Sequence, residues 1–333
     1  MDKGNKDNDK KNQQAKKILF LFVFFIGLPV IIGGIHFSHA KIIESIADGT
    51  VIQDFNFDEL VNEITDINRE IYYKKQGRYS TYVVEFNYYS VTMQDYITMN
   101  VYLPPGYILN QRMKRYPIVY YLHGAFDGEK EHWFTVDRRE GKSAHAELSA
   151  TRMIMNNEIK EIVMVALDEP GGFFTSGSDG RNFEYAFVNE IMPVIEATFS
   201  TSGERAITGL SSGGYYAFYF ALKYPNLFVY AGATSGSFFL SYADKSILNF
   251  MKKNLDNLKK LKGVYFDMGN DDPGNINDNL IIYNYLLKHN IRCRFEFVEG
   301  GHSFQVWRGH PERLLKFFFS IHPSVIPESR IIH

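Results

Sequence analysis

The segment Arg205-Ala206-Ile207-Thr208-Gly209-Leu210-Ser211-Ser212-Gly213-Gly214 decides the fold of this 333-residue chain. It reads as a short apolar strand that enters a G-x-S-x-G motif, and a helical pattern, Tyr215 to Lys223, follows at once. A serine in this setting occupies a sharp, strained turn, so that its hydroxyl projects from the backbone. The glycines on either side let neighbouring backbone approach without a Cβ clash. The context predicts Ser211 as a nucleophile, with the N–H of Ser212 facing a developing oxyanion.

An acid and a histidine follow the serine in the order that such a turn requires. Residues 263–269 read as a strand, and Asp271 and Asp272 lie in the loop that leaves it. A later strand pattern ends in Gly300-Gly301-His302, where the paired glycines allow the histidine to return over the sheet. His302 is predicted to take the serine proton and to return it, and Asp272 or Asp271 to orient the imidazole. The acid within the strand pattern, Asp267, is the weaker candidate.

A second oxyanion donor is expected in the loop after an early strand. The apolar run from Tyr116 to Leu122 leads directly into His123-Gly124-Ala125-Phe126. The backbone N–H of Ala125 is the first candidate and that of Phe126 the alternative. We expect His123 to hold this loop by a hydrogen bond rather than to carry protons.

Strand and helix patterns alternate along most of the chain, after two antiparallel strands expected between Thr81 and Leu103. Further strands are predicted near 117–122, 162–167, 205–209, 230–234, 263–268 and 293–298, and helices near 143–157, 183–198, 212–223, 244–260, 277–289 and 311–320. This alternation predicts an α/β class, with a mostly parallel central sheet and helices on both faces. An additional amphipathic helix is expected over Phe57–Tyr73, packed on the body.

Seven blocks of the chain resemble the putative-esterase branch of the α/β hydrolases, which includes feruloyl and acetyl-xylan esterases, S-formylglutathione hydrolases and mycolyltransferases. The blocks keep the order and spacing of that family over residues from about 80 to 320. They are Val101–Tyr107, Tyr121–Gly124, Glu131–Phe134, Phe187–Glu196, Gly209–Gly214, Gly269–Asp272 and Gly300–Trp307.

The resemblance implies an α/β-hydrolase fold and a preference between the two candidate acids. In the Gly-x-x-Asp block of the family the fourth position is the acid, and that position is Asp272 here. The position after the nucleophile is Ser212, where many members carry Met or Gln, but the backbone N–H survives that change.

Trp133 and Tyr215 are expected to line a sugar or phenolic-acyl site, and neither a metal nor an organic cofactor is needed.

Composition narrows the function classes. The net charge of −2 gives no electrostatic footprint for nucleic acid. The single cysteine, Cys293, excludes an intramolecular disulfide framework, and its place in a strand pattern favours packing over catalysis. We expect a small-molecule or polysaccharide-linked ester as the partner.

The first 40 residues read as a targeting segment. Lysines precede an uncharged apolar run, Ile18–Ile35, which as a helix would span about 27 Å. Its length favours a retained anchor, while Pro29 and the small residues before Ala40 favour cleavage as a signal peptide, so both remain open. Either way the body is expected to be exported. The expected domains are 1–40 (leader), 41–78 (a partly helical extension), 79–322 (the catalytic domain) and 323–333 (a tail).

These features predict an exported serine carboxylesterase that forms an acyl-enzyme. Its expected substrates are acyl esters, of feruloyl or acetyl type, on carbohydrate or envelope polymers. One alternative is an acyltransferase of mycolyltransferase type, in which a sugar or lipid hydroxyl replaces water. The other is an inactive hydrolase scaffold that binds carbohydrate.

Overall fold

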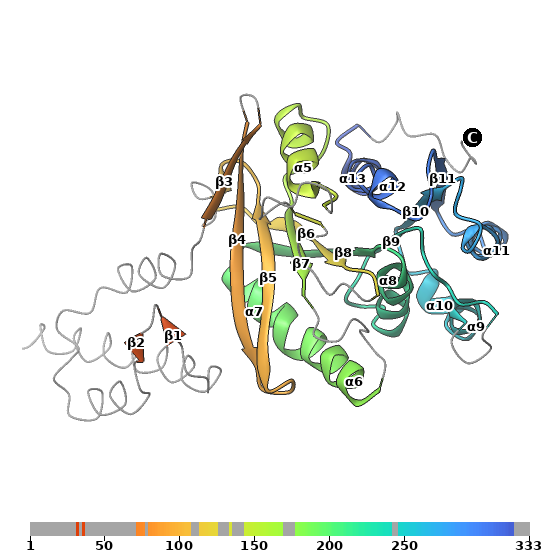
Figure 1. The fold of residues 1–333 in the computed structure, drawn as a ribbon, viewed down its shortest axis with the longest axis horizontal. Coiled ribbons are helices and arrows are strands. Elements are labelled where there is room, and N and C mark those ends of the chain that lie inside the picture. Colours follow the sequence, from red (N-terminus) through yellow and green to blue (C-terminus); the bar gives the residue numbers. More distant parts are fainter. Residues whose placement is uncertain are drawn as a thin grey trace, which may run out of the picture. The chain divides into compact units, whose positions relative to one another are not determined.

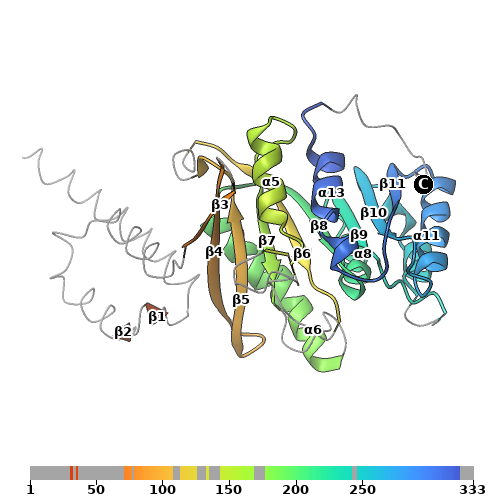
Figure 2. The ribbon, with the colours of Figure 1, turned by 45° about the horizontal axis from the view of Figure 1, so that its top comes forward.

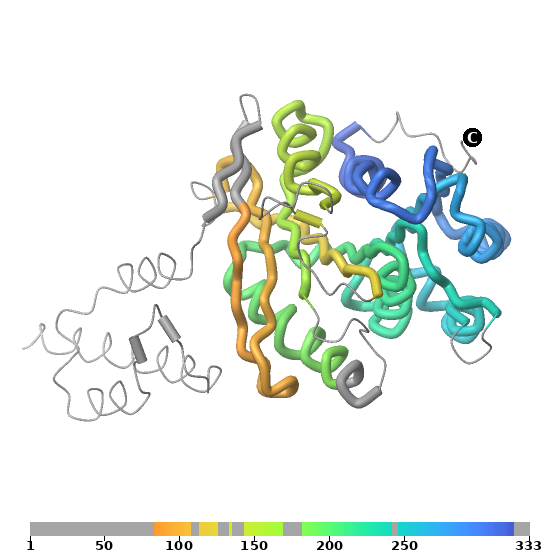
Figure 3. The backbone as a smooth tube through the Cα atoms, viewed as in Figure 1, coloured from red at the N-terminus to blue at the C-terminus, as the bar shows by residue number. Residues whose placement is uncertain are grey.

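The fold comes from a computed structural model, whose backbone is traced in Figure 3. It describes residues 31–32, 35–36, 71–76, 79–107, 113–125, 133–134, 143–168, 177–241 and 246–322. The chain divides into two compact units, Met1–Asn68 and Arg69–His333. In the first unit, β1 (Ile31–Ile32) pairs antiparallel with β2 (Ile35–His36). The remainder of the predicted leader, most of the extension and the tail lie outside the described residues. Within the part that is described, no helix is long and apolar enough to cross a membrane.

The second unit is built on a nine-stranded sheet, which runs across Figure 1 from β3 to β11. Its spatial order is β11-β10-β9-β8-β6-β7-β5-β4-β3. The strands are β3 (Ile71–Gln76), β4 (Tyr79–Ser90), β5 (Asp95–Leu103), β6 (Tyr116–Leu122), β7 (Val163–Leu167), β8 (Thr201–Gly209), β9 (Tyr230–Thr234), β10 (Gly263–Gly269) and β11 (Cys293–Val298). Strands β6 to β11 are parallel to one another, and the β5, β4 and β3 strands continue the sheet in antiparallel fashion. The mostly parallel sheet predicted from the sequence is thus confirmed.

Helices cover both faces of this sheet, as Figure 2 shows from a second direction. The helices are α5 (Ala146–Met155), α6 (Gly177–Ala186), the π-helix η3 (Phe187–Ile191), α7 (Met192–Thr198), α8 (Ser212–Lys223), α9 (Ile247–Lys253), α10 (Leu255–Leu258), α11 (Ile276–Lys288), α12 (Phe304–Trp307) and α13 (His310–Phe319). Helices α6 to α11 and η3 contribute to one buried cluster, and α5, α12 and α13 contribute to the other.

The two clusters follow from the two-residue period of a strand. Along β6, Ile118 and Tyr120 belong to the first cluster, whereas Val119 and Tyr121 belong to the second. All seven residues of β6 are buried. A central parallel strand covered on both faces reads as a continuous apolar run for this reason, and β6 is the strand that leads to the predicted oxyanion loop.

One predicted helix is wrong at its end. The pattern over Phe57–Tyr73 extends the helix to Tyr73, but Ile71–Gln76 form strand β3, paired antiparallel with β4. Ile71 and the two tyrosines that follow are residue types enriched in strands, and pairing with a long neighbouring strand outweighs their helical spacing. The rest of that predicted helix lies outside the described residues.

Two other predicted helices are interrupted. The helix near 244–260 is divided into α9 and α10 at Asn254, whose side-chain amide donates to the carbonyl of Phe250 at 2.9 Å. Asn competes in this way with the helical backbone bonds. The helix near 183–198 widens into the π-turn η3 just before Pro193, which has no N–H to continue the regular ladder.

Candidate active site

Ser211 occupies the turn between β8 and α8 in a strained conformation. Its φ of 52° and ψ of −122° lie outside the regions that non-glycine residues ordinarily adopt. The turn is tight: a Cβ on Gly209 would lie 2.3 Å from the carbonyl carbon of Gly213, and one on Gly213 would lie 2.2 Å from the carbonyl oxygen of His123. Both positions therefore require glycine, as the motif predicts.

Backbone hydrogen bonds from neighbouring strands hold this strained residue. The N–H of Ser211 donates to the carbonyl of Thr234 at the end of β9, at 3.0 Å. The carbonyl of Ser211 accepts from the N–H of Ser237 at 3.0 Å. Leu210 donates to Leu122 at the end of β6. The carboxyl ends of three parallel strands thus fix the turn that presents the hydroxyl.

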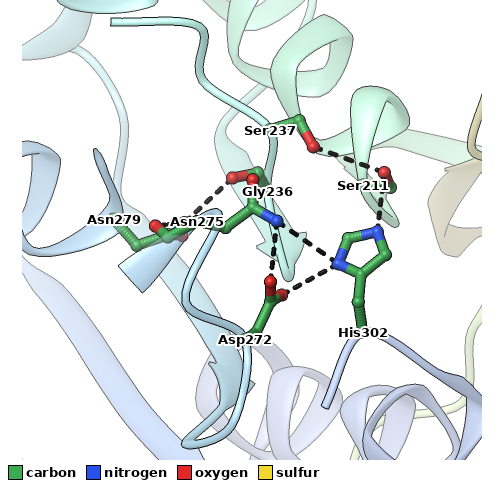
Figure 4. Close-up of polar contacts among 7 residues, drawn as sticks. All are labelled: Ser211, Gly236, Ser237, Asp272, Asn275, Asn279 and His302. Carbon is green, nitrogen blue, oxygen red and sulfur yellow. Dashed lines mark hydrogen bonds and ion pairs between the residues drawn. The ribbon is translucent and has the colours of Figure 1, made fainter. Parts of the chain in front are cut away.

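The structure brings the side chains of Ser211, His302 and Asp272 together (Figure 4). The Nε2 atom of His302 lies 3.0 Å from Oγ of Ser211, and its Nδ1 atom lies 2.8 Å from Oδ2 of Asp272. With Nδ1–H donating to the carboxylate, Nε2 of a neutral imidazole is left to accept the serine proton. The arrangement can transfer a proton from Ser211 to the imidazole and stabilise the resulting charge.

Of the two candidate acids, Asp272 is the one whose carboxylate reaches the histidine. It is 4% exposed, and its second oxygen, Oδ1, accepts a 2.9 Å hydrogen bond from Nδ2 of Asn275. The neighbouring Asp271 is exposed. Asp267 lies deeper in β10, fully buried, and contacts Nδ1 of His310 at 3.1 Å instead.

The loop that carries His302 is shaped by close backbone packing. A Cβ on Gly269 would lie 2.2 Å from the carbonyl oxygen of Gly300, and Gly300 itself has a φ of 127°. The His302 side chain remains 36% exposed, and the ring of Trp307 meets it edge to face with centroids 5.1 Å apart. The imidazole is therefore open to a substrate on one side and supported on the other.

The two predicted oxyanion donors belong to the residue after Ser211 and to the loop after β6, which approaches Ser211. Ser212 is the first residue of α8, where backbone N–H groups have no partner within the helix. Ala125 follows Gly124, and a Cβ added to Gly124 would lie 3.4 Å from Cβ of Ser211. The loop is held as expected by His123, which is buried and whose Nδ1 atom lies 2.7 Å from the carbonyl oxygen of Gly124. The alternative donor, Phe126, lies outside the described residues.

The two predicted substrate-lining aromatics differ in position. Trp133 is fully buried, its Nε1 donates to the carbonyl of Leu122 at 3.0 Å, and its ring packs on Tyr121. It is therefore part of the core behind β6, because a side chain already enclosed and hydrogen-bonded cannot face a ligand, and the prediction for Trp133 is corrected. Tyr215 is half-buried beside the Ser211 turn between β8 and α8 (the nucleophile elbow) and packs against Phe239, and burial raises its pKa to about 12. It remains a candidate.

Sequence reasoning missed two residues that touch the predicted triad. Ser237 follows β9, and its Oγ lies 3.3 Å from Oγ of Ser211. Asn275 is the N-cap residue of helix α11, and its side-chain amide donates to Asp272. Both follow the carboxyl ends of parallel strands, where sites of open α/β sheets gather, and that rule is the signal that would have identified them. Among the residues that the structure describes, no group of three His, Cys, Asp or Glu side chains forms a metal-binding cluster.

Comparison with known proteins gives one family match and several relatives. The family model described as "Putative esterase" matches residues 90–311. An endo-1,4-β-xylanase/feruloyl esterase of Xylanibacter ruminicola is 28% identical over 233 residues, which cover 67% of this chain and 29% of the relative. An esterase of Mycobacterium tuberculosis is 32% identical over 144 residues, which cover 41% of this chain and 28% of that protein. The chain thus spans less than a third of the length of these curated relatives.

Solved structures share the fold. A ferulic acid esterase superposes with a TM-score of 0.61 at 22% identity, covering 72% of this chain and 98% of that one. The feruloyl esterase module from Clostridium thermocellum complexed with sinapinate superposes with a TM-score of 0.59 at 20% identity. The match covers 78% of this chain and 94% of that module. An S-formylglutathione hydrolase from Staphylococcus aureus superposes with a TM-score of 0.57 at 19% identity. The match covers 71% of this chain and 98% of that one. At these identities the likeness shows the fold alone.

Proposed function

Because the chain belongs to the Putative esterase family of hydrolases that act on carboxylic esters, we propose that it is a serine esterase working through an acyl-enzyme. Ser211 attacks the ester carbonyl, while His302 takes its proton and then gives it to the departing alcohol. Asp272 orients the imidazole and stabilises its positive charge. Water then releases the acid by the same steps in reverse. The observation that carries this proposal is the pair of contacts of His302, 3.0 Å to Ser211 and 2.8 Å to Asp272.

The backbone N–H groups of Ala125 and Ser212 hold the oxyanion in this proposal. Support comes from the position of Ser212 at the start of α8 and from the closeness of Gly124 to Ser211. Two donors fixed by a strand end and a helix start stabilise developing charge without having to reorganise.

We extend the proposal to an aromatic or acetyl ester carried on a carbohydrate polymer outside the cytoplasm. Support for the substrate comes from relatives named as feruloyl esterases and from the half-buried aromatic ring of Tyr215 beside the elbow. Support for export comes from the lysine-flanked apolar segment Ile18–Ile35, retained as an anchor or removed as a signal peptide. No nucleic acid and no cofactor enter this mechanism.

The test is hydrolysis of p-nitrophenyl acetate and methyl ferulate by the full chain, beside Ser211→Ala. We expect the variant to lose activity by at least about 10³-fold and to resist labelling by a fluorophosphonate. Equal activity in the two proteins would refute the proposal. Addition of glycerol or trehalose separates hydrolysis from acyl transfer, since acylated acceptor in place of free acid would assign the transferase reaction instead.

A further inference from the structure

Ser237 places a second hydroxyl against the reacting atom of the site. Its Oγ lies 3.3 Å from Oγ of Ser211, on the side away from His302 (Figure 4). When Ser211 donates its proton to Nε2 of His302, its oxygen can still accept, and the Ser237 hydroxyl is then the donor. The separation is longer than a normal O–H···O bond of about 2.7 Å, so the contact is loose in the resting state.

The backbone around Ser237 is held firmly enough to aim this hydroxyl. Its own N–H donates to the carbonyl of Ser211, which fixes the two residues to each other. The preceding carbonyl, of Gly236, accepts a 2.9 Å bond from the buried side-chain amide of Asn279. On the other side, the N–H of Leu240 donates to Asp278 at 3.0 Å.

The segment also stores strain at two non-glycine residues. Ser235 has a φ of 47° and Phe239 a φ of 53°. Backbone in this region costs about 1–3 kcal/mol per residue and persists only where the surroundings hold it. The start of helix α11 supplies such support. Its N-cap residue, Asn275, bonds the predicted acid Asp272, and Asp278 and Asn279 in its first turn bond the residues on either side of Ser237.

We propose that Ser237 is a further catalytic residue that acts in the second half of the reaction, when the acyl-enzyme is hydrolysed. This inference rests on the proposed serine-esterase function. Water attacks the acyl carbon and His302 takes the water proton. The bond between that carbon and Oγ of Ser211 then breaks, its electron pair goes to Oγ, and His302 returns the proton to it. The Ser237 hydroxyl donates a hydrogen bond to Oγ as this charge develops.

The hydrogen bond from Ser237 to Oγ of Ser211 is expected to accelerate mainly the hydrolysis of the acyl-enzyme, because its strength increases during that half-reaction. In the acyl-enzyme, Oγ is an ester oxygen and a poor acceptor. In the transition state for its release, Oγ carries negative charge, which shortens and strengthens the bond from Ser237. In the first half-reaction Oγ starts as a hydroxyl that already accepts this loose contact, and it passes electron density to the carbonyl carbon as it attacks. The hydrogen bond from Ser237 therefore strengthens much less in that step than in the second half-reaction.

The experiment compares the two half-reactions in Ser237→Ala, in the full chain. The rate of fluorophosphonate labelling reports attack by Ser211 alone, and rapid-mixing measurement with p-nitrophenyl acetate separates the burst from the steady state. We expect the labelling rate to be unchanged. We expect hydrolysis of the acyl-enzyme to fall about tenfold, the loss of one hydrogen bond to a charged oxygen, so that the burst approaches one p-nitrophenolate per site. Ser237→Thr, which keeps a hydroxyl, should restore the second step.

The matched control is Ser235→Ala, which removes a buried hydroxyl from the same segment. Oγ of Ser235 has no hydrogen-bond partner among the described residues, so both half-reactions should remain at the wild-type rate. A Ser237→Ala variant that slows both steps equally, or neither, overturns the inference while Ser211-dependent hydrolysis stands. Hydrolysis that survives Ser211→Ala would instead remove the proposed function itself.

Discussion

At the scale of single residues, the two adjacent acids Asp271 and Asp272 present a matched pair. They differ in surroundings and not in chemistry: Asp272 is buried and bonded to His302 and Asn275, whereas Asp271 is exposed. We predict that Asp272→Asn lowers kcat about 10³–10⁴-fold with little change in KM, because the amide leaves the imidazole in the wrong tautomer. Asp271→Asn is expected to leave both constants unchanged. Steady-state kinetics with p-nitrophenyl acetate measures both, and a comparable loss in Asp271→Asn would assign the acid to the other residue.

The residues of the candidate site differ in how well the sequence predicts them. Ser211 lies in a local motif, and His302 and Asp272 lie in loops that two strand patterns and a family block mark out. Ser237 has no such mark, since its approach to Ser211 depends on how the segment after β9 crosses the sheet edge. Trp133 fails for a similar reason, because nearness to the oxyanion loop in sequence does not reveal that the ring turns into the core.

At the scale of elements, a buried ionic cluster ties together the strands that carry the site. Asp267 in β10 bonds Nδ1 of His310 at 3.1 Å and Arg313 of α13 at 2.7 Å. Nε2 of His310 in turn lies 2.9 Å from the hydroxyl of Thr208 in β8, just before the elbow. The guanidinium of Arg313 also donates to the carbonyl of Val306 in α12. The cluster therefore joins the strand before Ser211, the strand before Asp272 and the helices after His302.

The cluster makes stability depend on pH with a definite sign. Burial alone would raise the pKa of Asp267, but the charges of Arg313 and His310 outweigh it and lower the pKa below its usual value of 3.8. A group whose pKa is lower in the folded state stabilises the protein above the unfolded-chain pKa, and that contribution is lost as the pH falls below it. We predict that Asp267→Asn destabilises the protein by about 3 kcal/mol at neutral pH, because it leaves Arg313 without its partner. The difference in the free energy of unfolding between Asp267→Asn and wild type should become smaller as the pH falls from about 5 to about 3.

Urea unfolding of both proteins across this pH range measures the effect. The control is Glu312→Gln on helix α13, next to Arg313, which breaks partly exposed ion pairs with Lys316 and Arg152 and should cost less than about 2 kcal/mol. A difference between Asp267→Asn and wild type that stays constant down to about pH 3 would contradict the assignment of a lowered pKa to Asp267.

Strands and helices are well predicted from the sequence where the spacing of apolar residues follows a single period. The strands from β6 to β11 fall within a few residues of their predicted positions, because each is an apolar run or an alternating segment bounded by turn residues. Errors occur where tertiary pairing competes with local pattern. Ile71–Tyr73 join a sheet edge instead of a helix, and Asn254 and Pro193 interrupt helices whose apolar spacing continues across them.

At the scale of the whole catalytic unit, the single cysteine offers a probe of cooperativity. Cys293 begins β11, the edge strand of the sheet, which among the described strands pairs with β10 alone. It is nevertheless 2% exposed, enclosed with Leu286 of α11 and Phe295 in the larger core cluster. Burial raises the pKa of its thiol to about 12, so the native protein offers neither access nor thiolate to a reagent.

We predict that a thiol reagent labels Cys293 at least about 10³-fold more slowly in the native protein than in urea-unfolded chain. The decisive quantity is how that rate changes with low concentrations of urea. If β11 and α11 belong to the same cooperative unit as the elbow and the loops of Asp272 and His302, labelling requires global unfolding, and its urea dependence will match the equilibrium slope. A native labelling rate that is insensitive to urea would mean that β11 opens by itself. The loop leaving its carboxyl end carries His302, so such opening would also release the proposed base from Ser211, and labelling and loss of activity would then share one rate.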